Sequence, residues 1–153
     1  MSENIKNKII IQTRDFGEQE ILEEDIIYFP NGLFAFEECK KFVLFSPLGD
    51  EASPMWLQCV DSVTPCFIVF KPMDLLTDYK PVPIAEDLSV INLEKEEEIE
   101  YLSIAVVPND YKNTTLNIKS PIVINRNKRI AIQTVLTENY DLRFPLYKTI
   151  KGA

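Results

Sequence analysis

The chain has 153 residues, of which 24 are acidic and 16 basic, so its formal net charge is −8. This length suits one domain, residues 1–153, which buries roughly 70% of its unfolded surface. A hydrophobic content of 46% excludes disorder over most of the length. The acidic balance disfavours direct nucleic-acid binding, which depends on Lys and Arg. It suits a basic protein partner, or it serves only to keep the protein soluble.

Short runs of β-branched and aromatic residues recur along the chain between proline and glycine turns, a pattern typical of strands. The clearest runs are residues 8–13, 25–29, 42–45, 55–60, 66–70, 99–107, 116–118, 122–125 and 130–136. About eight to ten short strands with frequent turns favour an all-β fold. We therefore expect a compact, single-domain, β-barrel-like fold of short antiparallel strands with one or two short helices, although a sandwich fits the same pattern.

The segments between these runs carry weaker signals. Residues 85–93 are the best candidate for a helix, because Glu86 and Asp87 would lie in its first turn. Residues 37–41 are expected to form one helical turn, and residues 73–83 an irregular connection. The polar and aromatic tail, residues 137–153, is expected to fray at its end.

The stretch from Asp25 to Phe42 combines a strand-like run, a Pro-Asn-Gly turn and four phenylalanines. Leu33 and Phe34 follow the turn directly, and two consecutive residues of an extended chain face opposite sides. One of the two is therefore expected to be exposed. An exposed aromatic residue at a turn is a candidate anchor for a protein partner, with core packing as the alternative. The candidate docking residues here are Leu33, Phe34, Phe36 and Glu37.

The three cysteines, Cys39, Cys59 and Cys66, are odd in number and include no CxxC pair. This pattern predicts neither a disulfide framework nor a zinc site. Buried, reduced thiols are expected instead, in keeping with a reducing cytosol. The N-terminal apolar run is too short for a secretory signal, so a cytoplasmic protein is expected.

No set of residues in the sequence supports catalysis, and no cofactor or metal is expected. The chain lacks histidine, which is the commonest general base, and its four glycines are too far apart for a phosphate-binding loop. The densest charge run, Glu94 to Glu98, is expected to be solvated, because adjacent like charges resist burial. Glu96, Glu97 and Glu98 are thus candidates for an electrostatic steering surface, with a plain soluble loop as the alternative.

A third candidate surface is the segment from Asn117 to Asn125. Asn117, Pro121 and Asn125 could present backbone groups to a partner. The alternative is a bent edge strand whose polar groups are satisfied internally.

Four segments together resemble the flagellar assembly factor FliW family, from about Ile10 to Pro145. They are TRDFGEQEILEEDIIYFPNGLFAFEECKKFVLF, WLQCVDSVTPCFIVFKP, DYKP and LNIKSPIVINRNKRIAIQTVL. The first and last of these segments are specific in combination, because their order and separation also fit the family. One departure is Ala35, where the family usually has glycine; if that position requires a positive φ, the turn geometry differs here.

The resemblance implies a compact β-barrel and a cytoplasmic, non-enzymatic regulator. Members of the family bind CsrA, a small dimeric translational repressor that binds RNA, and stop it from repressing flagellin mRNA. They also bind newly made flagellin, which releases CsrA. The rival class is a small-molecule-binding β-barrel, which would need an internal cavity lined by polar groups.

Overall fold

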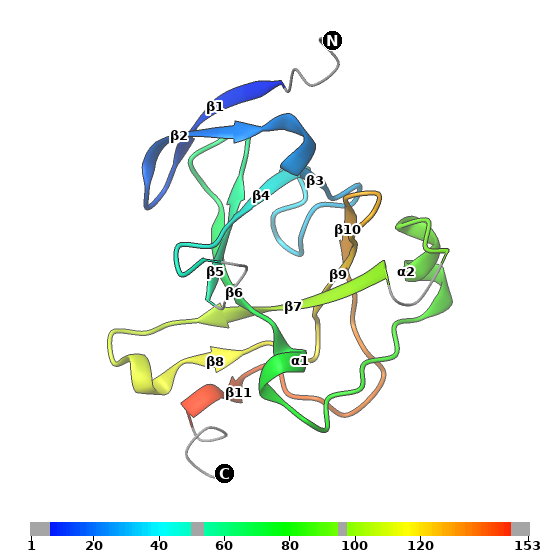
Figure 1. Cartoon of the computed structure of the whole chain (residues 1–153). Helices are drawn as coiled ribbons and strands as arrows, with labels where there is room; N and C mark the ends of the chain where they lie inside the picture. Colours follow the sequence, from blue (N-terminus) through cyan, green and yellow to red (C-terminus); the bar gives the residue numbers. More distant parts are fainter. Residues whose placement is uncertain (1–6, 50–53, 95–97, 148–153) are drawn as a thin grey trace.

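A computed structural model describes residues 7–49, 54–94 and 98–147. Strands dominate these residues, with two short α-helices and two 3-10 helices (Figure 1). The elements in chain order are β1 (Lys8–Thr13), β2 (Gly17–Leu22), η2 (Glu23–Asp25), β3 (Ile27–Tyr28), β4 (Lys41–Phe45), β5 (Met55–Cys59), β6 (Cys66–Phe70), α1 (Pro72–Leu75), α2 (Ala85–Val90), β7 (Ile99–Val106), η4 (Tyr111–Asn113), β8 (Thr115–Leu116), β9 (Ile122–Asn125), β10 (Ile130–Gln133) and β11 (Phe144–Pro145).

Seven of these strands close into a barrel. They are hydrogen-bonded in the order β7-β6-β5-β4-β3-β10-β9, and β9 pairs again with β7. Closure removes the sheet edges, which would otherwise present unpaired backbone groups. Neighbouring strands are antiparallel except β3 and β10, which run parallel with Tyr28 opposite Ile130. The predicted β-barrel is confirmed, with this one parallel pair as a departure from the all-antiparallel expectation.

The barrel interior is filled with apolar side chains. Its fully buried members include Ile27, Phe29, Leu33, Phe42, Met55, Leu57, Val69, Leu102, Ile122 and Ile124. Strand β9 shows why the sequence reads as a continuous apolar run: Ile122 and Ile124 face this core, whereas Val123 between them packs with Ile91 beyond α2. The space in which a small-molecule-binding barrel would hold its ligand is therefore occupied by side chains.

The β1–β2 hairpin lies across one end of the barrel (Figure 1). Ile11 and Ile21 of the hairpin pack against Val43 of β4. At the tip, Phe16 contacts the Phe45 and Trp56 rings at 5.8 and 5.5 Å between centroids. These contacts attach a two-stranded hairpin, which is marginal alone, to a stable body.

Several local expectations need correction. Residues 72–75 form helix α1, which begins with Pro72 at a position where proline favours helix initiation. Residues 37–41 form turns and the start of β4 rather than a helical turn, and Phe144–Pro145 adds strand β11 to the tail. The helix expected at 85–93 is present as Ala85–Val90.

The expectation of three reduced thiols is wrong for two of them. Cys39 and Cys59 form a disulfide with 6.5 Å between their Cα atoms, whereas Cys66 is free and buried. The cause is the register of β4 and β5, which places Phe42 opposite Cys59 and so brings the chain before β4 alongside the end of β5. A separation of 20 residues in sequence does not reveal this proximity.

The helices of the described residues are short. None of the helices there combines the length and the apolar character that crossing a bilayer requires.

Candidate docking site

The loop between β3 and β4 carries two exposed aromatic side chains, Phe34 at 49% and Phe36 at 43% exposure. We call this pair the aromatic ridge. Leu33, which precedes Phe34, is only 1% exposed and packs in the barrel core. The sequence expectation that Leu33 and Phe34 face opposite sides is confirmed, and the structure identifies Phe34 as the exposed one.

A tight turn displays the ridge. The Phe36 N–H donates to the Leu33 carbonyl at 2.8 Å, and Ala35 between them has a φ of 71°. This is the arrangement of a type II turn, whose third residue needs a positive φ. Ala35, where the resembling family usually has glycine, therefore occupies a left-handed conformation despite its Cβ.

Gly32 makes the close approach behind this turn possible. Its φ is +66°, and a Cβ at this position would lie 2.5 Å from the Cα atom of Glu37. The Glu37 side chain is exposed and accepts a hydrogen bond from the Ala35 N–H at 3.2 Å. Glu37, a predicted docking residue, therefore also holds the turn in shape.

Two contacts from other strands position the ridge. The Phe34 N–H donates to the Gln133 side chain of β10 at 3.0 Å, and Gln133 is itself buried. The Phe36 ring meets Phe67 of β6 edge to face, with 5.2 Å between centroids. Gln133 and Phe67 were not found by sequence reasoning, because only the barrel closure brings β6 and β10 to this loop.

Beside the ridge lies a surface hollow of about 580 Å³. Its lining includes Phe36, the disulfide cysteines Cys39 and Cys59, and three carboxylates, from Glu37, Glu38 and Asp61. Those carboxylates are all on exposed residues. The site thus combines apolar aromatic surface with an acidic rim, which suits a partner that carries an apolar anchor flanked by basic groups.

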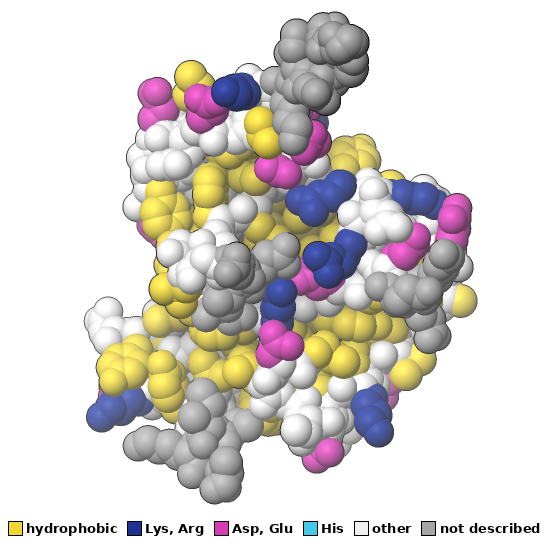
Figure 2. All heavy atoms as spheres, in the orientation of Figure 1, with side chains coloured by type: hydrophobic (Ala, Val, Ile, Leu, Met, Phe, Trp, Pro, Cys, Tyr) yellow, Lys and Arg dark blue, Asp and Glu magenta, His cyan; other side chains and the backbone are white. Residues whose placement is uncertain are grey.

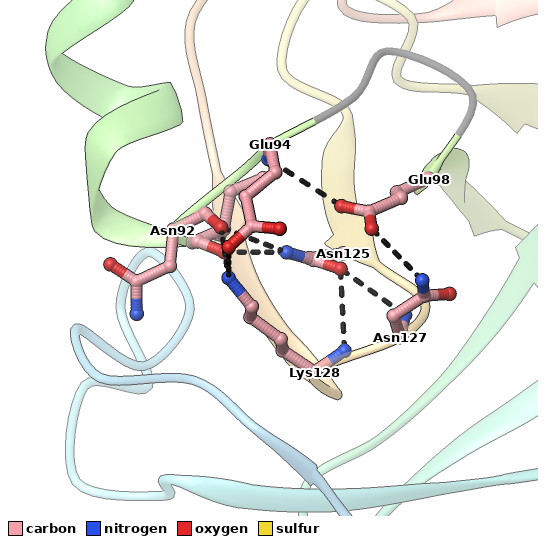
Figure 3. A network of polar contacts seen from close by, with 7 residues as sticks. Asn92, Glu94, Glu98, Asn125, Asn127 and Lys128 are labelled. Atoms are coloured by element: carbon pink, nitrogen blue, oxygen red, sulfur yellow. Dashed lines mark hydrogen bonds and ion pairs between the residues drawn. The ribbon is translucent and has the colours of Figure 1, made fainter.

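The predicted steering residue Glu98 has a different environment. It is 9% exposed, and its carboxylate accepts hydrogen bonds from the Asn127 side chain at 2.9 Å and the Glu94 N–H at 3.5 Å (Figure 3). The expectation that the whole charge run is solvated is wrong for Glu98, because these donors compensate its burial. Glu96 and Glu97 lie outside the described residues.

Asn125 is fully buried and forms the centre of the same network (Figure 3). Its amide donates to the Ile91 carbonyl at 2.8 Å, and its oxygen accepts from the backbone N–H groups of Asn127 and Lys128 at 3.1 and 3.3 Å. Asn125 therefore fixes the turn after β9 to the end of α2. Because it is buried, it is not accessible to a docking partner.

The other two residues of the third candidate surface, Pro121 and Asn117, also accept hydrogen bonds from within the chain. Pro121 is buried, and its carbonyl accepts from the Thr134 N–H at 3.1 Å. Asn117 is half-buried and accepts from the Ser120 N–H at 2.8 Å. This matches the alternative of internal satisfaction, although β9 is paired on both sides and is not an edge strand.

Charges of both signs are interleaved on the face shown in Figure 2, with apolar areas between them. The net charge of −8 is thus not displayed as one acidic patch on that face. Within the part of the chain that the structure describes, no group of three or more Cys, Asp or Glu side chains is arranged to hold a metal ion.

Two buried groups outside the ridge have perturbed acidity. Burial raises the pKa of the Cys66 thiol, although the nearby Arg14 lowers it in part. Burial also raises the pKa of the Tyr79 hydroxyl, which donates to the Ile118 carbonyl at 2.8 Å. Both shifts favour the neutral form, so neither group is activated as a nucleophile.

Comparison with known proteins gives a consistent result. The model of the family described as FliW protein matches residues 8–146. The flagellar assembly factor FliW of Caldicellulosiruptor saccharolyticus is 35% identical over 150 residues, 97% of both chains. That of Natranaerobius thermophilus is 36% identical over 140 residues, 90% of this chain and 91% of the relative. A crystal structure of the flagellar assembly factor FliW superposes with a TM-score of 0.84 at 31% identity, covering 91% of this chain and 97% of that chain.

Proposed function

Because the chain belongs to the FliW family of flagellar assembly factors, we propose that it regulates flagellar assembly by binding other proteins rather than by catalysing a reaction. Its partners in this proposal are the translational repressor CsrA, which it antagonises, and newly made flagellin. Flagellin binding then controls how much CsrA is released. The protein acts in the cytoplasm, where both partners are synthesised.

The observation that carries the proposal is the exposure of Phe34 and Phe36 on a rigid turn. Buried aromatic anchors dominate the binding energy of many protein interfaces. A turn that is held by hydrogen bonds and by Gly32 loses little conformational freedom on binding, which favours affinity. We therefore assign the aromatic ridge as the principal docking site.

The acidic character of the protein supports a second element of the proposal. A net charge of −8 and the carboxylates beside the ridge attract a basic RNA-binding protein and raise its association rate. The same charges repel RNA from the complex. Antagonism of CsrA then combines occupation of the repressor with electrostatic exclusion of its RNA ligand.

Replacement of Phe34 tests the docking role. Phe34→Ala should weaken binding of flagellin, CsrA or both by about 1 kcal/mol or more, while the free energy of unfolding changes little. The affinity is measured by calorimetry with each purified partner. The matched control is Leu142→Ala, because Leu142 is 61% exposed and lies outside the ridge. Unchanged affinity for both partners, or a variant that fails to fold, would contradict the assignment.

Leu33→Ala provides the opposite reference. Leu33 lies in the core, so its truncation should lower the free energy of unfolding by about 2–5 kcal/mol. If Leu33→Ala and Phe34→Ala destabilised the protein equally, both would be core residues. The assignment of the aromatic ridge as a docking site would then be wrong.

Association kinetics test the electrostatic element. The double variant Glu37→Gln and Glu38→Gln should lower the CsrA association rate, since each exposed carboxylate contributes to steering. The difference from the natural protein should shrink as salt shortens the screening length. An association rate that depends on neither salt nor these carboxylates would refute steering and leave the ridge assignment intact.

A further inference from the structure

The disulfide between Cys39 and Cys59 lies at the base of the aromatic ridge and opens onto the surface. Both cysteines line the hollow of about 580 Å³ that also contains Phe36. Cys39 is half-buried, whereas Cys59 at the end of β5 is only 2% exposed. A small thiol entering the hollow therefore meets the Cys39 sulfur before the Cys59 sulfur.

The disulfide is a covalent tether for the loop that carries the ridge. The Cys39 N–H donates to the Phe36 carbonyl at 3.3 Å, so a shift of Cys39 is passed on to the ridge. The other contacts described for the ridge, from Leu33, Gln133 and Phe67, are non-covalent. Non-bonded sulfur atoms need more room than bonded ones, and Cys59 is fixed in its strand. Opening the bond therefore moves Cys39 and loosens the turn that displays Phe34 and Phe36.

We propose that the Cys39–Cys59 disulfide is a thiol–disulfide exchange site, opened faster by small thiols without net negative charge than by anionic ones, and that its state controls how firmly the aromatic ridge is held. Oxidised protein presents a rigid ridge, and reduced protein presents a looser one. The consequence for partner affinity rests on the proposed function.

The exchange balances without any further reactant. A thiolate of the small thiol attacks the Cys39 sulfur, forms a mixed disulfide and breaks the bond to Cys59, which leaves as a thiolate and takes up a proton. A second small thiol then attacks the mixed disulfide and releases the Cys39 thiol, with the small disulfide as the oxidised product. The Lys41 carbonyl, 3.5 Å from the Cys39 sulfur, is placed to accept a hydrogen bond from that thiol. The small disulfide closes the site by the reverse sequence.

The charge of the hollow determines which thiols react fastest. The described residues that line it include Glu37, Glu38 and Asp61 but no Lys or Arg. An anionic thiol is repelled by these carboxylates, whereas an ammonium group on the thiol is attracted. Cysteamine should thus reduce the disulfide fastest, 2-mercaptoethanol less fast and 3-mercaptopropionate slowest. Each rate is first normalised to the reaction of the same thiol with a neutral small disulfide.

The exchange chemistry is tested by mass spectrometry on the full chain. Oxidised protein should be reduced by millimolar cysteamine without denaturant, and several-fold more slowly by 3-mercaptopropionate at low salt. Added salt, or the triple variant Glu37→Gln, Glu38→Gln and Asp61→Asn, should narrow that difference. Cysteamine disulfide should label Cys39 in the Cys59→Ala variant but leave Cys59 unlabelled in the Cys39→Ala variant. Equal labelling of both variants, or resistance of the folded protein to cysteamine, would overturn the proposal.

Hydrogen exchange tests the link to the ridge without any partner. The Phe36 and Cys39 amides should exchange at least several-fold faster in reduced than in oxidised protein, while amides of β9 stay unchanged. The double variant Cys39→Ala and Cys59→Ala should resemble the reduced form under both conditions, and Cys66→Ala should respond like the natural protein. Identical exchange in the two redox states would show that the disulfide does not control the ridge.

Flagellin affinity then separates this inference from the proposed function. Oxidised protein should bind flagellin several-fold more tightly than reduced protein. If the two redox states bound flagellin with equal and measurable affinity, redox control would be refuted but the proposed function would not. If neither redox state bound flagellin or CsrA, the proposed function would fail, and the labelling and hydrogen-exchange results would still decide the exchange site.

Discussion

Leu33 and Phe34 are adjacent in the chain but face opposite sides of the barrel wall, with exposed fractions of 1% and 49%. Leu33 anchors the loop in the core, and Phe34 on the opposite side is exposed to solvent. The turn from Leu33 to Phe36 therefore affects both the packing of the core and the shape of the surface. Its geometry can be tested apart from binding.

The close approach behind the turn predicts different effects of the same substitution at two glycines. Gly17 and Gly32 have similar φ values, +68° and +66°, but a Cβ meets nothing within 4 Å at Gly17 and lies 2.5 Å from the Glu37 Cα at Gly32. Gly17→Ala should cost about 1–2 kcal/mol for the left-handed conformation alone. Gly32→Ala should cost about 1–3 kcal/mol more, because the backbone must also shift. Urea unfolding measures the free energy of unfolding of both variants. Equal losses in the two would contradict the close approach between Gly32 and Glu37.

Ala35 leads to a prediction of the opposite sign. At a φ of 71° its Cβ is strained, so Ala35→Gly should raise the free energy of unfolding by about 0.5 kcal/mol or more, after the entropy gained by the unfolded chain is subtracted. The control is Ala105→Gly within strand β7, which should lower it by at least about 0.5–1 kcal/mol. If both substitutions destabilised the protein, Ala35 would not be strained in solution.

Local sequence patterns predicted much of this fold. The β-branched run Lys8–Thr13 and the buried run Cys66–Phe70 coincide with β1 and β6, because alternation and flanking turns are short-range signals. The order of strands around the barrel, and the closing pair β7–β9, join residues far apart in sequence and were not specified by any local pattern. Element types were thus accessible from sequence, whereas their neighbours in space were not.

The candidate site shows the same division. The opposite orientation of Leu33 and Phe34 was predicted from the alternation of an extended chain, although Phe34 lies in a turn. Which of the two is exposed depends on the barrel core. Glu98 was expected to be solvated because it lies in a charge run. Its burial depends on Asn127, which the closure of β9 onto β7 brings close. The Cys39–Cys59 bond likewise depends on the β4–β5 register.

Asn125 is predicted to be a stability determinant rather than a contact residue. Asn125→Ala would remove the partner of the Ile91 carbonyl and of two backbone N–H groups, at Asn127 and Lys128. Each unsatisfied buried group costs about 1–3 kcal/mol, so a total loss of about 2–4 kcal/mol is expected after partial relaxation. Thermal or urea unfolding provides the measurement. Asn109→Ala, at an exposed position, is the control and should change stability by less than about 0.5 kcal/mol.

A pH-dependent contribution is predicted where the β1–β2 hairpin meets the barrel. The Asp15 carboxylate accepts two hydrogen bonds from Arg14, at 3.1 and 2.9 Å, and one from the Trp56 indole at 2.9 Å. The Arg14 hydrogen bonds, followed by the one from Trp56, hold the pKa of Asp15 below its ordinary value, although desolvation opposes them. A lowered pKa in the folded state means that the stabilisation is complete above the ordinary carboxyl pKa, about 3.9, and is lost as the pH falls through the lowered value.

Asp15→Asn should therefore lower the free energy of unfolding at pH 7, and the gap to the natural protein should close as the pH falls below the ordinary carboxyl pKa and through the lowered one. The gap at pH 7 should stay below about 1 kcal/mol, because the Asp15 side chain is 39% exposed and solvent screens its ion pair. Trp56, the only tryptophan of the chain, reports the unfolding by fluorescence. Glu20→Gln, which breaks the exposed pair with Lys8 on the same hairpin, controls for the loss of a surface charge. A gap that widened at low pH would show that Asp15 destabilises the hairpin contact when charged.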